Sequence, residues 1–258
     1  MDVVNNKSVV TLRKGTRNWV NRGPWVAYTG YRRFVDFKKL TFIIQTLNEY
    51  PSVQNGQGLD LGCGEGNISL PLSSLGYRLI GIDIATGDIS TAKDRKARLL
   101  GSQDSPEFLV GDVESLPISE GAFDFVICSE VLEHLKHPEK ALDSTFRVLK
   151  KRGILIVTVP NGFGPYSLIY DHFRNKVVSK ITSNIGRSEH LNVFTLGRIK
   201  SLLNQAGFRN FVRVKNSEFV SFLPILVKSE MFCRWDCKLA DNLPPIMVSG
   251  FYIVCRKE

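Results

Sequence analysis

The chain has 258 residues, of which 43% are hydrophobic and 23% are charged, and its formal net charge is +9 at pH 7. This composition is that of a globular protein with room for one large domain, and it excludes a fibrous or disordered chain. No apolar run approaches the ~18–20 residues that span a bilayer, and the N-terminus lacks the apolar segment of a secretory signal. We therefore expect a cytoplasmic protein without a transmembrane segment.

The five cysteines are scattered and odd in number, which argues against a disulfide framework. Cys233 and Cys237 are four residues apart and would share one face of a helix. No second pair of Cys or His residues lies nearby in the sequence, so a zinc site is not expected.

Positive charge is concentrated at the N-terminus, where residues 1–40 hold nine Lys and Arg against two Asp. Such an arm can bind nucleic acid, anionic lipid or an anionic substrate, or it can be a solvated leader. Residues 1–33 also include four aromatic residues among these cations, namely Trp19, Trp25, Tyr28 and Tyr31. Aromatics in this setting can stack on single-stranded nucleic acid, but we interpret them as part of a lid over a small-molecule pocket. Apolar residues at three- and four-residue steps predict a helix over 34–49, which completes an N-terminal cap of residues 1–50.

From residue 58 onward, strand and helix signals alternate along the chain. Strands are predicted at 58–61, 78–84, 108–110, 123–129, 153–159, 208–215 and 250–256, and helices at 67–75, 86–100, 138–149 and 195–206. The strand at 153–159 is wholly apolar, which is typical of a parallel sheet covered on both faces. The alternation predicts a doubly wound α/β fold with a mostly parallel seven-stranded, Rossmann-like sheet and a ligand at the carboxyl ends of the strands.

Two segments interrupt this alternation, at 161–193 and 216–249. The first includes a basic stretch at 173–187, and the second begins with an apolar run at 219–227. We interpret residues 1–258 as one domain, with the ligand-binding core at 56–160 and the two insertions on the substrate side or at a homodimer interface.

A glycine-rich turn follows the first predicted strand and reads Gly58-Leu-Asp-Leu-Gly-Cys-Gly-Glu-Gly66. Glycines at alternate positions allow positive φ and a close approach of backbone to a ligand. The dinucleotide fingerprint G-x-G-x-x-G needs a third glycine where this chain has Asn67. The carboxylate of Asp60 also disfavours a pyrophosphate and favours a ligand with an ammonium or sulfonium charge. A nicotinamide-dependent oxidoreductase is therefore disfavoured.

Residues 59–66, Leu-Asp-Leu-Gly-Cys-Gly-Glu-Gly, resemble the first motif of class I S-adenosylmethionine-dependent methyltransferases. Residues 124–135, Asp-Phe-Val-Ile-Cys-Ser-Glu-Val-Leu-Glu-His-Leu, resemble the fourth-strand region of the same family. The second run is most similar to the ubiquinone-biosynthesis O-methyltransferase type and its small-molecule relatives. The resemblance covers roughly residues 56–210 and implies S-adenosylmethionine as cofactor and S-adenosylhomocysteine as product.

The resemblance also implies a set of cofactor contacts. The turn would hold the methionine half, Asp83 would accept the ribose hydroxyls, Asp112 would accept the adenine amino group, and the backbone near Ser129 would meet the methionine amino group. The full predicted set is Asp60, Gly62, Cys63, Gly64, Gly66, Asp83, Ile84, Asp112, Val113, Ser129 and Glu130.

Four residues are candidates for chemistry on the acceptor. Glu130, Glu133 and His134 have the spacing of one helix face, and His190 matches a histidine that precedes a helix in such relatives. In some quinone and small-RNA methyltransferases a similar set holds a divalent metal that activates a hydroxyl. We predict instead that no metal is used and that His134 and His190 act as general base or orienting groups.

The predicted reaction is SN2 transfer of a methyl group to O, N or C of a small acceptor that is hydrophobic or anionic. An RNA methyltransferase that uses the basic arm is the alternative. A non-enzymatic binding or scaffold protein that has kept the cofactor pocket is disfavoured, because an acid is present at the end of each of the first three predicted strands.

Overall fold

The computed structural model describes residues 34–53, 55–101, 104–165, 167, 190–220 and 230–258. The predicted basic arm and aromatic lid over residues 1–33 lie outside these ranges, as do the basic stretch at 173–187 and most of the apolar run at 219–227. Those interpretations therefore stay predictions.

Seven strands form one sheet in the order β3-β2-β1-β4-β5-β7-β6, with β7 antiparallel to both neighbours and the other pairs parallel. The doubly wound, mostly parallel sheet that the sequence predicted is confirmed. The strands are β1 (Gln57–Leu61), β2 (Arg78–Asp83), β3 (Glu107–Val110), β4 (Phe123–Ser129), β5 (Leu149–Pro160), β6 (Asn210–Asn216) and β7 (Gly250–Arg256).

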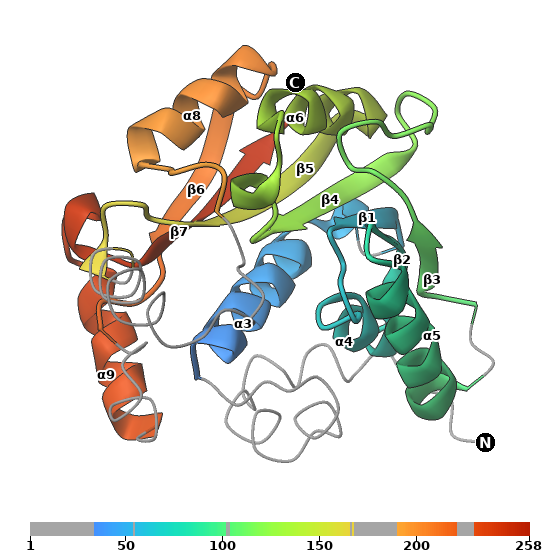
Figure 1. Cartoon of the computed structure of the whole chain (residues 1–258), viewed down its shortest axis with the longest axis horizontal. Coiled ribbons are helices and arrows are strands. Elements are labelled where there is room, and N and C mark those ends of the chain that lie inside the picture. The colour runs from blue at the N-terminus through green and yellow to red at the C-terminus, as the bar shows by residue number, and fades with distance from the viewer. Residues whose placement is uncertain (1–33, 54, 102–103, 166, 168–189, 221–229) are drawn as a thin grey trace, which may run out of the picture.

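Helices cover both faces of the sheet, as Figure 1 shows. On one face lie α3 (Phe34–Glu49), α4 (Ser69–Ser74) and α5 (Thr86–Leu100), and on the other lie α6 (Pro138–Val148) and α8 (Leu196–Gln205). The described residues also form the short 3-10 turns η1 (Pro51–Val53), η2 (Leu132–His134) and η5 (Pro245–Met247). No helix in the described ranges is long and apolar enough to cross a membrane.

Strand β5 explains why a parallel sheet needs a continuous apolar run. Leu155 and Val157 point into the core under α6 and α8, whereas Ile154 and Ile156 point into the core under α3. All four are fully buried. Since both faces are covered, alternate residues along the strand are equally apolar.

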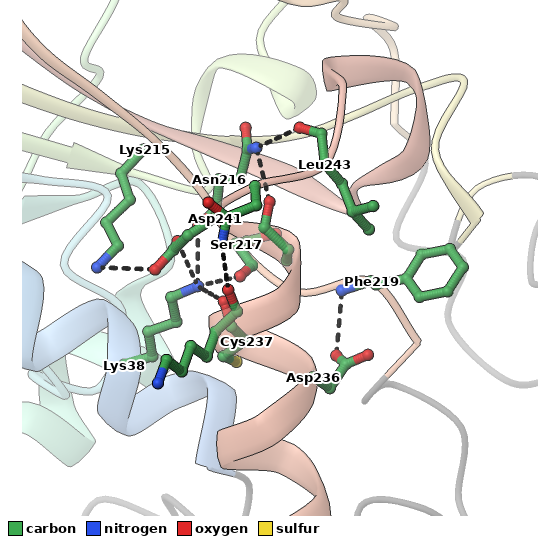
Figure 2. Close-up of polar contacts among 12 residues, drawn as sticks. Lys38, Lys215, Asn216, Ser217, Phe219, Asp236, Cys237, Asp241 and Leu243 are labelled. Carbon is green, nitrogen blue, oxygen red and sulfur yellow. Dashed lines mark hydrogen bonds and ion pairs between the residues drawn. The ribbon is translucent and has the colours of Figure 1, made fainter.

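The segment between β6 and β7 contains α9 (Glu230–Ala240), which lies beside α3 (Figure 1). Lys38 of α3 joins the two, because its ammonium donates to the carbonyls of Asn216, Ser217 and Cys237 and pairs with Asp241 at 3.3 Å (Figure 2). The predicted shared face of Cys233 and Cys237 is confirmed, and both are buried on α9. None of the five cysteines forms a disulfide.

Two predicted helix bounds were wrong. The helix expected at 67–75 is only Ser69–Ser74, with Ile68 as its N-cap and Leu75 as its C-cap, although the Leu70 N–H already donates to the Gly66 carbonyl at 3.0 Å as in an α-helix. Leu149 was expected at the end of a helix but begins β5, since its backbone is already extended.

Candidate cofactor and acceptor site

The glycine turn has a left-handed backbone at Gly62, Gly64 and Gly66, with φ of 64°, 49° and 82°. A Cβ on Gly62 would lie 2.4 Å from Cγ2 of Val131, and a Cβ on Gly66 would lie 2.8 Å from Cζ of Phe108. On Gly64 the nearest atom would be 4.0 Å away, an oxygen of Asp88. Packing therefore requires glycine at 62 and 66, whereas Gly64 faces open space in which a ligand can approach the backbone.

Asp83 joins the turn to the helix that follows β2. Its Oδ2 accepts the Gly64 N–H at 2.8 Å, and its Oδ1 accepts the Ala85 N–H at 2.9 Å. Each carboxylate oxygen has a second lone pair, so the predicted bonds to ribose hydroxyls remain available. The sequence did not indicate that the same carboxylate also orients the turn.

Asp60 lies under the turn and is only 1% exposed. It accepts a hydrogen bond of 2.6 Å from Ser69 Oγ, and burial raises its pKa to about 7. Its predicted attraction for a cationic cofactor would therefore act through space and not by contact.

The residues that are predicted to contact the adenine end of the cofactor follow β2 and β3. Ile84 is 71% exposed directly after Asp83, which is unusual for a large apolar side chain beside a buried strand. Asp112 is exposed, and its Oδ1 accepts the Glu114 N–H at 2.8 Å. The side chains of Val113 and Cys63 are buried in the core instead, so these two could offer a ligand only their backbone groups.

At the end of β4, Ser129 and Glu130 are bonded to β5. Thr158 Oγ1 lies 2.9 Å from Ser129 Oγ and donates to Glu130 Oε1 at 2.8 Å. Glu130 has a left-handed backbone with φ of 56°, and its N–H donates to the Thr158 carbonyl at 2.9 Å. The prediction that Glu130, Glu133 and His134 share one helix face was therefore wrong, because a turn separates Glu130 from the short η2.

Glu133, His134 and His190 nevertheless come together, with one candidate ligand atom of each lying within 4.8 Å of the others. Glu133 Oε1 is 3.9 Å from His134 Nε2, and the two imidazole ring centroids are 5.1 Å apart. The Asn192 N–H donates to the Glu133 carbonyl at 2.9 Å, which brings the segment after His190 against η2. The structure thus brings together three of the four residues that the sequence singled out for acceptor chemistry, and Glu130 is not in this cluster.

The buried carboxyl of Glu133 is the unusual member of this cluster. Burial and then the charge of Glu130 raise the pKa of Glu133 to about 9, and its Oε2 has no hydrogen-bond partner among the described residues. Lys39 of α3 is half-buried and lowers the pKa of both Glu133 and Asp60. The sequence gives no indication of Lys39, because only the packing of α3 against the sheet brings it near these acids.

A cavity of about 520 Å³ lies beyond the end of β5. Its lining is mostly apolar and comprises Asn161, Phe163, Thr195, Leu196, Gly197, Lys200, Pro245, Ile246 and Phe251. The segment from His190 to Thr195 therefore has one end at the histidine cluster and the other at this cavity.

Comparison with known proteins agrees with this geometry. Residues 59–157 match the family model described as a methyltransferase domain. The chain is 27% identical over 162 residues to a ubiquinone biosynthesis O-methyltransferase of Rickettsia typhi, covering 62% of this chain and 63% of that protein. It is 25% identical over 156 residues to a demethylmenaquinone methyltransferase of Renibacterium salmoninarum, covering 60% and 63%. The chain thus spans less than two thirds of the length of these relatives.

Solved structures share the fold at lower sequence identity. A SAM-dependent methyltransferase of Thermotoga maritima superposes with a TM-score of 0.60 and 20% identity, covering 94% of this chain and 97% of that one. The [4+2]-cyclase SpnF superposes with a TM-score of 0.61 and 18% identity, covering 85% and 80%. Because a cyclase has this fold as well, the fold alone does not define the reaction. Residues 59–157 of this chain therefore match a methyltransferase domain in sequence, and the chain shares its fold with a SAM-dependent methyltransferase.

Proposed function

We propose that the protein transfers a methyl group from S-adenosylmethionine to O, N or C of a small, apolar acceptor. The observation that supports this most is the open face of Gly64, which lies within the matched domain. The Gly64 N–H donates to Asp83, and the residue after Asp83 is the exposed Ile84. The cofactor supplies the reactive sulfonium, and the chain supplies binding and alignment.

Each end of the cofactor has a proposed partner. The backbone at Gly62 to Gly66 and at Ser129 would hold the methionine half, and the half-buried ammonium of Lys39 would attract its carboxylate. Asp83 would accept the ribose hydroxyls. Ile84 and Asp112 would contact the adenine ring and its amino group.

The acceptor would enter from the side of β5. The lining of the apolar cavity supports a hydrophobic acceptor, since the amide of Asn161 is already occupied by the carbonyls of Pro245 and Val248 at 2.9 and 2.8 Å. The relatives named ubiquinone biosynthesis O-methyltransferase and demethylmenaquinone methyltransferase also support a hydrophobic acceptor. His134 and His190 would take or orient the acceptor proton.

The cluster of Glu133, His134 and His190 favours a second candidate, metal-assisted O-methylation. One carboxylate and two imidazoles are suitable ligands for a divalent metal, and the unpartnered Glu133 Oε2 fits that role. A metal there would lower the pKa of an acceptor hydroxyl. The RNA alternative depends on residues 1–33 and gains no support from the described part of the chain.

Calorimetry with S-adenosylmethionine, S-adenosylhomocysteine and NAD tests the cofactor. We expect micromolar binding of the first two and none of NAD; failure of both to bind below millimolar concentration would refute the proposal. A methyl-transfer screen of quinols, other phenols, lipids and RNA, with and without chelator, then tests the acceptor. Transfer that a chelator leaves unchanged would exclude the metal-assisted candidate.

A further inference from the structure

Arg95 of α5 contacts the residues immediately before and after Gly66, the last glycine of the turn. Its guanidinium pairs with the carboxylate of Glu65 and donates to the Glu65 carbonyl at 3.4 Å and to Asn67 Oδ1 at 3.1 Å. Its side chain is only 20% exposed. Glu65 and Asn67 flank Gly66, so one side chain fixes the two residues on either side of a left-handed position.

The turn needs such external contacts because its own backbone is intrinsically unrestrained. Three glycines between 62 and 66 have positive φ, and glycine loses more conformational freedom on ordering than any other residue. The first half of the turn is held by β2, since the Gly62 and Cys63 N–H groups donate to the Ile82 carbonyl at 2.8 and 3.1 Å. Arg95 supplies a corresponding constraint on the second half.

Arg95 also offsets a concentration of negative charge. Burial raises the pKa of Asp88, the charges of Asp83 and Glu65 raise it further, and Arg95 lowers it. Without Arg95, the Glu65 carboxylate would be repelled by these acids and would move away from them. That movement would displace the backbone next to the open face of Gly64.

We propose that Arg95 is a positioning residue for the cofactor, which holds the glycine turn in its binding conformation through Glu65 and Asn67. This inference rests on the proposed cofactor. Arg95 acts through the turn and not by contact with the ligand. Its planar fork, which a lysine lacks, allows one group to reach a carboxylate, a carbonyl and an amide together.

The test measures the affinity for S-adenosylmethionine and for S-adenosylhomocysteine in the wild type, Arg95→Gln and Arg95→Lys. Positioning predicts that Arg95→Gln weakens both ligands by the same factor, about tenfold or more. Arg95→Lys keeps the charge but not the three contacts, so it should recover only part of that loss. Arg98→Gln is the matched control, because Arg98 is an exposed arginine on the same helix.

A pure charge effect gives a different result. Loss of a positive charge would then favour the sulfonium-bearing donor over its neutral product, so the ratio of the two affinities would change in Arg95→Gln and stay unchanged in Arg95→Lys.

Adding Glu65→Gln to Arg95→Gln should restore part of the affinity, since it removes the repelled carboxylate. Thermal melting of each variant separates a loss of fold from a loss of binding.

The outcomes distinguish the two proposals. If the wild type binds neither ligand, the proposed cofactor is wrong. If the wild type binds both and Arg95→Gln binds them as tightly as Arg98→Gln does, the role of Arg95 is wrong. A change in the ratio of the two affinities alone would also overturn the positioning role.

Discussion

Gly64 and Gly76 have the same backbone handedness but different surroundings. Their φ angles are 49° and 94°, and a Cβ on either would meet no atom closer than about 4 Å. We predict that Gly64→Ala and Gly76→Ala each destabilise the fold by about 1 kcal/mol, the cost of a left-handed alanine. Only Gly64→Ala should lose cofactor affinity, because its methyl group would occupy the open face of the turn.

The measurement is S-adenosylhomocysteine binding by calorimetry, together with the melting temperature of each variant. Gly76 lies on the loop before β2, so it controls for backbone strain alone. Equal affinity in the two variants would show that the ligand does not approach Gly64.

Asp60 gives the stability a predictable pH dependence. Burial holds the pKa of Asp60 in the folded protein at about 7, above its ordinary value of 3.8. Its contribution to stability is therefore complete below about pH 4 and is lost as the pH rises to about 7. We predict that Asp60→Asn, which can still accept the Ser69 hydroxyl, matches the wild type near pH 4 and exceeds it by a few kcal/mol at pH 8.

Urea unfolding of the ligand-free protein at both pH values checks this prediction. The difference between variant and wild type isolates Asp60 from the other titrating groups. Asp143→Asn, on the exposed side of α6, should show no such change with pH. A constant difference between Asp60→Asn and the wild type would mean that Asp60 is already ionised in the folded state at pH 4.

At the scale of elements, the sequence predicted the helices and strands in which apolar residues recur at a regular spacing. The helices at 34–49 and 86–100 and the strands at 123–129 and 250–256 have the predicted bounds. Glu130 shows where such reasoning fails. Its left-handed backbone is set by hydrogen bonds to Thr158, which lies 28 residues away in the chain. Spacing within a segment contains no information about such a partner, so a turn was mistaken for a helix.

Thr195 is the N-cap of α8, because its Oγ1 accepts the Arg198 N–H at 3.1 Å. We predict that Thr195→Ala destabilises the protein by about 1 kcal/mol and that Thr195→Ser has little effect. Chemical denaturation of the two variants measures this difference. Thr91→Ala is a suitable control, since Thr91 lies within α5 and its hydroxyl donates to the Gly87 carbonyl of its own helix. A loss for Thr91→Ala as large as that for Thr195→Ala would argue against a capping effect.

At the scale of the molecule, the carboxyl edge of the sheet collects groups from distant parts of the chain. The sequence indicated the acids there because each one lies at or just beyond the end of a predicted strand, and parallel strands end at one edge. It did not indicate Arg95, Lys38 or Lys39. These cations lie on helices, and their partners are decided by how helices pack on the sheet.

Lys38 is the clearest case, since its partners are 178 to 203 residues away along the chain. Its side chain is 10% exposed, and its ammonium serves three carbonyls and a carboxylate that connect α3 with β6 and α9 (Figure 2). Lys38→Met keeps much of the apolar stem but removes the donor that the Asn216, Ser217 and Cys237 carbonyls share. Asp241 keeps its ion pair with Lys215 at 3.3 Å, and its N–H still donates to the Cys237 carbonyl at 3.3 Å. We therefore predict a loss of about 2–3 kcal/mol in the free energy of unfolding.

Hydrogen exchange should show where that stability is lost. In Lys38→Met the amides of α9 should exchange faster, while those of β1 and β4 in the centre of the sheet should change only as far as global stability falls. Lys93→Met, an exposed lysine on α5, should leave both sets unchanged. If the two variants unfold at the same denaturant concentration, the network does not join α9 to the rest of the fold. If α9 alone loses protection, Lys38 is the contact through which the segment between β6 and β7 is fixed against α3 and the sheet.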